Sequence, residues 1–114
     1  MPDLIGVPAM FSRIKRSFNG GEETEDEIIE EYIGRGILFL DDIGAENPSE
    51  YVRQTSYLII NGRYEREKQT VFTSNLSPTD LADRIGTRIV SRICETCKII
   101  EITGKDRRLE QTKR

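Results

Sequence analysis

Two adjacent carboxylates, Asp41 and Asp42, stand at the end of the apolar run 37–40, whose side chains are branched or aromatic. Such a run, bounded by Gly36, predicts a short strand that is buried on both faces, as in a parallel sheet. Ligands bind beyond the carboxyl ends of such strands, so the acids stand where a metal or phosphate site would be built. On this stretch alone, a polar turn before Gly44 explains the pair equally well.

A third polar side chain, Asn75, follows the β-rich run 70–73. Because the carboxyl ends of parallel strands meet at one edge of a sheet, we expect Asn75 to lie beside Asp41 and Asp42. Carboxylates and an amide at one edge suit a metal or phosphate site, since their oxygens can hold magnesium. The alternative for Asn75 is a turn residue that helps to cap the next helix.

The rest of the chain predicts an alternation of strands and helices. We expect parallel strands near residues 4–7, 37–41, 71–75 and 98–102, and helices over 8–18, 24–34, 48–67, 78–85 and 87–95. Three capping patterns support these boundaries: Thr24 with Glu27, Asn47 followed by Pro48, and Ser77 followed by Pro78. The sequence therefore predicts an α/β fold.

Length and composition narrow the class of protein. The 114 residues are enough for one domain at most, and a composition of 32% charged and 36% hydrophobic residues suits a soluble globular chain. No apolar run is long enough for a transmembrane helix and the start lacks the features of a signal peptide, so we expect no membrane partner and a cytoplasmic location. The absence of histidine excludes histidine-based triads and metal sites.

Charge and cysteine usage leave alternatives open. Residues 22–31 are strongly acidic and predict a solvated helical face, whereas the basic last third, from Arg84 onward, suits either contact with phosphates or a mixed-charge surface. Cys94 and Cys97 form a C-x-x-C pair between a helix and a strand. We expect reduced, structural thiols, with a redox or intermolecular metal role as the alternative.

Four segments, 36–46, 73–77, 84–93 and 104–108, carry a family resemblance when they are taken in this order and spacing. The first resembles a Walker B motif, and together they resemble the AAA+ helicase-loader ATPases typified by bacterial DnaC and DnaI, with the transposition helper IstB as a relative. The resemblance implies a partial Rossmann-like P-loop NTPase (AAA+) fold of three layers with a parallel sheet, over residues 1–109, followed by a basic tail at 110–114.

The resemblance also implies roles for individual residues. Asp41 would hold magnesium, Asp42 would act on the attacking water, and Asn75, as sensor 1, would contact the γ-phosphate and that water. Asp42 departs from the glutamate usual at this position in AAA+ proteins, and its shorter reach predicts slow turnover. Arg92 resembles the arginine finger that reaches the nucleotide of a neighbouring subunit, with Arg88 as the alternative.

In the last motif, Arg108 matches sensor 2, which contacts the nucleotide in cis, with Arg107 as the alternative. The family implies ATP and Mg²⁺ as cofactors. However, the sequence contains no G-x-x-x-x-G-K-[ST] loop, so we expect a C-terminal part of the ATPase domain that is inactive toward ATP when alone.

The partners implied are a replicative helicase, single-stranded DNA and further subunits of the same protein. For the bases Arg13, Lys15 and Arg16 we expect an ordinary solvated helical face, with contact to DNA as the family's alternative. Two other functions stay open: a helper ATPase of a transposase, and a non-catalytic interaction module.

Overall fold

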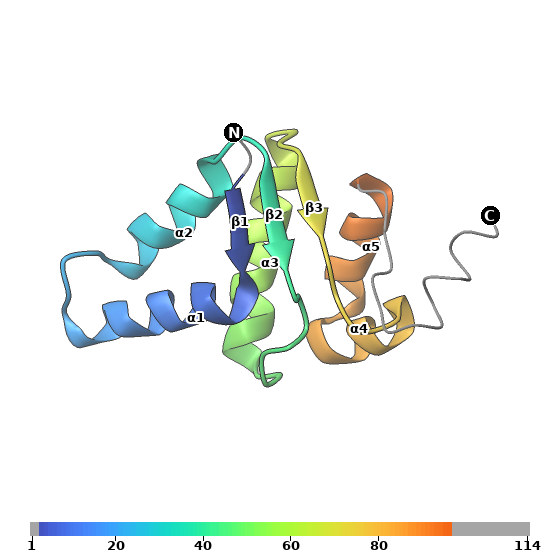
Figure 1. The fold of residues 1–114 in the computed structure, drawn as a ribbon, viewed down its shortest axis with the longest axis horizontal. Helices are drawn as coiled ribbons and strands as arrows, with labels where there is room; N and C mark the ends of the chain where they lie inside the picture. Colours follow the sequence, from blue (N-terminus) through green and yellow to red (C-terminus); the bar gives the residue numbers. More distant parts are fainter. Residues whose placement is uncertain (1–2, 97–114) are drawn as a thin grey trace.

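The computed structural model describes residues 3–96, and its centre is a parallel sheet of three strands (Figure 1). The strands are β1 (Asp3–Gly6), β2 (Leu38–Asp41) and β3 (Thr70–Phe72), in the order β1-β2-β3. Leu40 of β2 lies opposite Ile5 on one side and Phe72 on the other. The predicted parallel arrangement of these strands is confirmed, whereas the strand predicted at 98–102 lies outside the described residues.

Among the described residues, five α-helices surround this sheet, close to the positions that the sequence predicts. They are α1 (Val7–Arg16), which continues into the 3₁₀ turn η1 (Ser17–Asn19), α2 (Glu25–Gly34), α3 (Glu50–Glu65), α4 (Pro78–Ile85) and α5 (Thr87–Thr96). In Figure 1, α1 and α2 lie on the β1 side, α4 and α5 lie on the β3 side, and α3 lies behind the sheet. Within residues 3–96, no helix is long and apolar enough to cross a membrane.

Side-chain caps fix the starts of three helices. The capping box at α2 is confirmed: the Thr24 hydroxyl accepts from the Glu27 N–H, and the Glu27 carboxylate accepts from the Thr24 N–H. Ser77 caps α4 as predicted. The prediction that Asn47 caps the third helix is wrong, because the Ser49 hydroxyl accepts from the Val52 N–H at 3.1 Å and the helix begins at Glu50.

The core lies mainly between the sheet and α3. Leu38 and Leu40 are fully buried, and Leu40 lines a small internal cavity with Met10 of α1 and Ile59 of α3. Phe39, which alternates with them, points to the opposite face and is only half-buried. The prediction of burial on both faces is therefore wrong for one face, because α3 covers only the side that carries the two leucines.

Candidate functional site

The carboxyl ends of β2 and β3 open into a pocket of about 240 Å³. Its lining consists of polar residues that end β2 or follow the two strands: Asp41, Asp42, Thr73, Ser74 and Asn75. The parallel order of β2 and β3 thus brings together the two acids and the asparagine that the sequence analysis selected. Asp41 and Asn75 are exposed to solvent at this edge, and Asp42 is half-buried.

Hydroxyl groups from the end of β3 hold the acid pair in place. The Thr73 hydroxyl donates to Asp41 Oδ1 at 2.5 Å and accepts from the Asp42 N–H at 2.9 Å. Next to it, the Ser74 hydroxyl donates to the Ile43 carbonyl at 2.6 Å. Neither Thr73 nor Ser74 is predicted from the sequence as a site residue, although both stand in a motif that carries the family resemblance.

The loop that follows the acids is held by α4 and the turn before it. Gly44 has φ +94°, and a Cβ there would stand 2.6 Å from Leu81 Cδ1 and 2.9 Å from Leu76 Cδ1. The Arg84 guanidinium donates to the carbonyls of Gly44 at 2.8 Å and Glu46 at 3.1 Å. Arg84 is therefore a structural anchor of this loop. It stands in a motif that carries the family resemblance, but its residue type alone does not indicate this role.

The arginine expected to be a finger lies elsewhere. Arg92 Nε donates to Asn61 Oδ1 at 3.1 Å, and its guanidinium lies 4.5 Å from the centre of the Tyr64 ring. Both partners belong to the second half of α3, far along that helix from Ser49, which follows the acid loop. Arg88, the alternative, stacks over Tyr57 at 5.5 Å. Neither arginine lines the pocket that contains the acids.

Several expected residues lie outside the described part of the chain, namely Arg107, Arg108 and Cys97. Cys94 is a free, exposed thiol near the end of α5. Among residues 3–96, no group of three or more acidic, histidine or cysteine side chains is placed to hold a metal ion. Two carboxylates beside an amide nevertheless suit Mg²⁺, since this ion keeps several waters and is usually shared with substrate phosphates.

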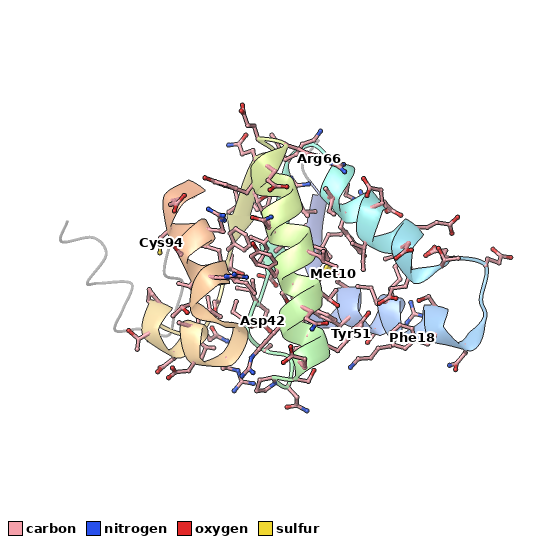
Figure 2. The ribbon with its side chains drawn as sticks, turned by 180° about the vertical axis from the view of Figure 1, so that it is seen from behind. Met10, Phe18, Asp42, Tyr51, Arg66 and Cys94 are labelled. Atoms are coloured by element: carbon pink, nitrogen blue, oxygen red, sulfur yellow. The ribbon has the colours of Figure 1, made fainter. Side chains whose placement is uncertain are left out.

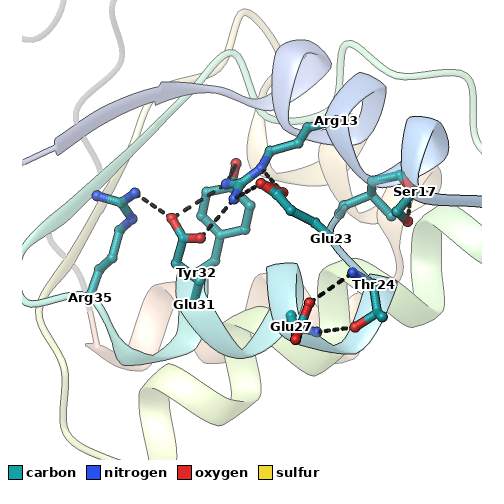
Figure 3. A network of polar contacts seen from close by, with 9 residues as sticks. Arg13, Ser17, Glu23, Thr24, Glu27, Glu31, Tyr32 and Arg35 are labelled. Atoms are coloured by element: carbon teal, nitrogen blue, oxygen red, sulfur yellow. Dashed lines mark hydrogen bonds and ion pairs between the residues drawn. The ribbon is translucent and has the colours of Figure 1, made fainter. Parts of the chain in front are cut away.

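Arg13 of α1 is engaged with acids (Figure 3). Arg13 pairs with Glu23 at 2.8 Å and with Glu31 at 2.7 Å, and it also donates to the Tyr32 hydroxyl. Hydrogen bonds from Arg13, and then from Arg35, lower the pKa of the Glu31 carboxyl below its usual value. The expectation that the acidic run is simply solvated is thus wrong for Glu23 and Glu31.

An aromatic pair, the exposed Phe18 and the half-buried Tyr51, lies where α1 ends and α3 begins, and Figure 2 shows the two rings close together. The Phe18 ring meets the Tyr51 ring edge-on at 5.6 Å, and Phe18 is 54% exposed. The Tyr51 hydroxyl donates to Glu25, and burial together with this bond raises the pKa of Tyr51 to about 12. Phe18 lies at the end of the helix predicted over 8–18, but the buried residues of α1 end at Ile14.

Comparison with known proteins connects this architecture to DNA replication. No family profile matches the chain. It is 28% identical to the replicative helicase loader DnaC of Buchnera aphidicola subsp. Baizongia pistaciae, over 79% of this chain and 37% of that protein. It is 26% identical to the loader DnaI of Bacillus subtilis, over 92% of this chain and 37% of that protein. The chain thus spans little more than a third of the length of these relatives.

Solved structures show the same relationship. A crystal structure of the DnaC helicase loader superposes with a TM-score of 0.76 at 28% identity, covering 89% of this chain and 60% of that one. DnaI gives a TM-score of 0.73 at 30% identity, over 88% and 56%. The replication initiator DnaA, bound to AMPPCP and single-stranded DNA, gives 0.71 at 25% identity, over 87% and 30%.

The parallel sheet and its flanking helices have part of the AAA+ P-loop fold seen in DnaC, DnaI and DnaA. Within that class, the chain matches a fragment of the DnaC/DnaI-like helicase loaders.

Proposed function

We propose that this chain is part of an ATP-dependent helicase loader, which acts in the cytoplasm and places a replicative helicase on single-stranded DNA. The observation that carries the proposal is the meeting of Asp41, Asp42 and Asn75 in one pocket at the edge of a parallel sheet. The similarity to DnaC and DnaI supports the choice of helicase loading over other AAA+ activities.

In this proposal the two acids and the asparagine of the pocket have different tasks. Asp41 holds magnesium through its water shell, Asp42 orients the water that attacks the γ-phosphate, and Asn75 contacts the γ-phosphate and that water. Bound magnesium would offset the negative charge of the phosphates. Aspartate reaches less far than glutamate, so we expect slow turnover, which suits a switch.

Arg92 is proposed to act on the nucleotide of a neighbouring subunit. Its place beside Asn61 and Tyr64, outside the pocket of its own chain, supports action in trans over action in cis. A planar guanidinium suits this task because it spreads positive charge over several phosphate oxygens. Self-association through this face is part of the proposal, and Arg108 as sensor 2 remains a prediction.

The test of the ATPase roles is a chimera in which this chain replaces the matching residues of Bacillus subtilis DnaI. We expect the chimera to hydrolyse ATP and to load its helicase. Arg92→Ala should lower turnover by about tenfold or more while leaving ATP binding intact, because the finger acts on the transition state. Equal loss of binding and turnover would indicate a structural role for Arg92.

Two other outcomes of this test would count against the proposal. Unchanged turnover in Asp41→Ala would contradict the assignment of the pocket. Stimulation of a transposase, with no effect on helicase loading, would favour the transposition helper.

Single-stranded DNA is proposed to contact the surface formed by α1 and the aromatic pair. The nucleobases of single-stranded DNA stack on exposed aromatic rings, and its phosphates attract nearby cationic side chains. Here the exposed Phe18 lies two residues from the exposed Arg16. Lys15 is also exposed and pairs only loosely with Glu46, at 3.4 Å. Arg13 contributes little, since two carboxylates already neutralise it.

Fluorescence anisotropy of labelled oligothymidine tests this surface on the 114-residue chain itself. Phe18→Ala should weaken binding by about 1 to 3 kcal/mol, as expected for the loss of one stacking platform. Leu58→Ala is the matched control. Leu58 is similarly exposed, at 55%, but it lies later in α3 than Tyr51 and is not part of the aromatic pair. Equal binding by the wild type and Phe18→Ala would contradict the proposed DNA surface.

A further inference from the structure

Thr73 touches both acids of the pocket, although it carries no charge and stands at the end of a different strand. Its hydroxyl donates to Asp41 Oδ1 at 2.5 Å and accepts from the Asp42 N–H at 2.9 Å. A single hydroxyl thus joins the side chain of one acid to the backbone of the next. Because a hydrogen bond to a carboxylate is charge-assisted, it restricts the rotation of that side chain more strongly than a neutral bond would.

Backbone hydrogen bonds fix the position of this hydroxyl. The Thr73 N–H donates to the Leu40 carbonyl at 3.1 Å, and the Thr73 carbonyl accepts from the Ile43 N–H at 2.8 Å. These bonds continue the pairing of β2 with β3 by one residue and enclose the acid pair between them. The side chain of Thr73 is therefore held against the turn by its own backbone.

The conformation of Asp42 explains why such support is needed. Asp42 has φ +67°, in the left-handed region that non-glycine residues rarely occupy. Its N–H is directed to the Thr73 hydroxyl, and the N–H of the next residue is directed to the Thr73 carbonyl. Thr73 thus offsets the strain at the residue whose carboxylate would orient the attacking water.

We propose that Thr73 is a positioning residue that sets both acids for their work with a divalent cation. By engaging Asp41 Oδ1, it restricts the carboxylate that would hold the cation, and it holds Asp42 in the left-handed turn. This inference rests on the proposed magnesium role of Asp41. It assigns no direct contact between Thr73 and substrate.

The test uses Mn²⁺ as a paramagnetic probe in place of Mg²⁺, with the ¹⁵N-labelled 114-residue chain. Bound Mn²⁺ broadens the amide signals of nearby residues, so the Mn²⁺ concentration that halves the signals of residues 41–44 reports occupancy of the site. Thr73→Val keeps the shape of the side chain but removes the hydroxyl. We expect it to raise that concentration about fivefold or more, and to shift the Asp42 amide signal, whose hydrogen-bond acceptor is lost.

Two variants separate positioning from general destabilisation. Thr73→Ser restores the hydroxyl and should return the Mn²⁺ dependence to within about twofold of wild type, because the charge-assisted bond is remade. Thr24→Ala removes the side-chain cap of α2, so it lowers stability without touching the acids or the helix that supports their loop, and it should leave the Mn²⁺ dependence unchanged. If Thr73→Val does not fold, Thr73→Ala supplies the same comparison.

Each other result counts against the inference in a distinct way. A folded Thr73→Val variant with the Mn²⁺ dependence of wild type would overturn the positioning role and leave the proposed ATPase function standing. A wild-type chain in which Mn²⁺ spares residues 41–44 would overturn the cation role of Asp41, and with it this inference. The DnaI chimera tests the function independently, through turnover and helicase loading.

Discussion

Arg63 shows how much of this fold depends on one side chain. It is 1% exposed, yet it carries a permanent charge. Its guanidinium donates to the carbonyls at the end of α2, before β2 and before β3, and to one hydroxyl: Tyr32, Ile33, Arg35, Gly36, Gln69 and Thr70. Arg63 thereby satisfies helix-terminal carbonyls that the helix itself leaves without a donor.

Arg63→Met should therefore destabilise the chain strongly. Removal of the guanidinium leaves two buried and three part-buried carbonyls without this donor, and we expect a loss of about 3 kcal/mol or more in the free energy of unfolding. Urea denaturation of the purified chain measures this change. Arg66→Met is the matched control, because Arg66 pairs with Glu30 on the surface and should contribute less than about 1 kcal/mol. Similar losses for the two variants would contradict the structural role of Arg63.

The Arg13–Glu31 pair predicts how stability depends on pH. Because hydrogen bonds from Arg13 and Arg35 lower the pKa of Glu31 in the folded chain, the folded state binds this proton less readily than the unfolded state. The contribution of Glu31 to the free energy of unfolding is therefore complete at neutral pH. It is lost as pH falls below about 4.5, the ordinary pKa of this carboxyl. Since Glu31 is 38% exposed, we expect no more than about 1 kcal/mol.

Urea midpoints at pH 7 and pH 3 check this prediction. Glu31→Gln should reduce the loss of stability on acidification, and adding Arg13→Gln should reduce it little further, since both changes remove the same interaction. Additive effects of the two substitutions would show that the pair is not coupled.

At the scale of elements, α4 is the support of the acid loop. Leu81 packs against Gly44, and Arg84 donates to the carbonyls of the same loop. Gly44→Ala places a Cβ 2.6 Å from Leu81 Cδ1 at φ +94°, so it combines backbone strain with a clash. We expect a loss of about 2 to 4 kcal/mol, the sum of a left-handed backbone penalty and overpacking.

Gly20→Ala is the matched control for this prediction. Gly20 has φ +80°, but a Cβ there would meet nothing within 4 Å, so only the backbone penalty of about 1 to 2 kcal/mol applies. The difference between the two variants in urea denaturation measures the packing of α4 on the acid loop. No difference would mean that α4 moves away freely.

At the scale of the whole molecule, the acid pocket alone is expected to be a poor ATP site. Asp41 and Asp42 line the pocket and repel a triphosphate. Arg88 and Arg92, which could offset that charge, lie outside the pocket. The exposed cations that remain attract phosphate weakly and are screened by salt. Titration of the 114-residue chain with a fluorescent ATP analogue and Mg²⁺ at near-physiological salt should show no saturable binding. Micromolar affinity, about −8 kcal/mol, that is lost in Asp41→Ala would contradict this expectation.

The order of helices and strands was determined by the sequence alone. Helical spacing of apolar residues, the caps at Thr24 and Ser77, and the alternation of helix with strand are local signals that act within a few residues. They predicted five helices and four parallel strands, and the three strands that fall within residues 3–96 are confirmed. They also predicted the meeting of Asp41 with Asn75, because a parallel order places all carboxyl ends at one edge.

Only the tertiary structure decided which side chains meet across that framework. Thr73 reaches Asp41 across 32 positions of sequence, and Arg63 reaches Tyr32 across 31, so no local period encodes either contact. The exposure of Phe18 and the half-burial of Phe39 likewise depend on which surface a neighbouring helix covers. Local patterns fix the elements, whereas the support of the acids is set by how those elements pack.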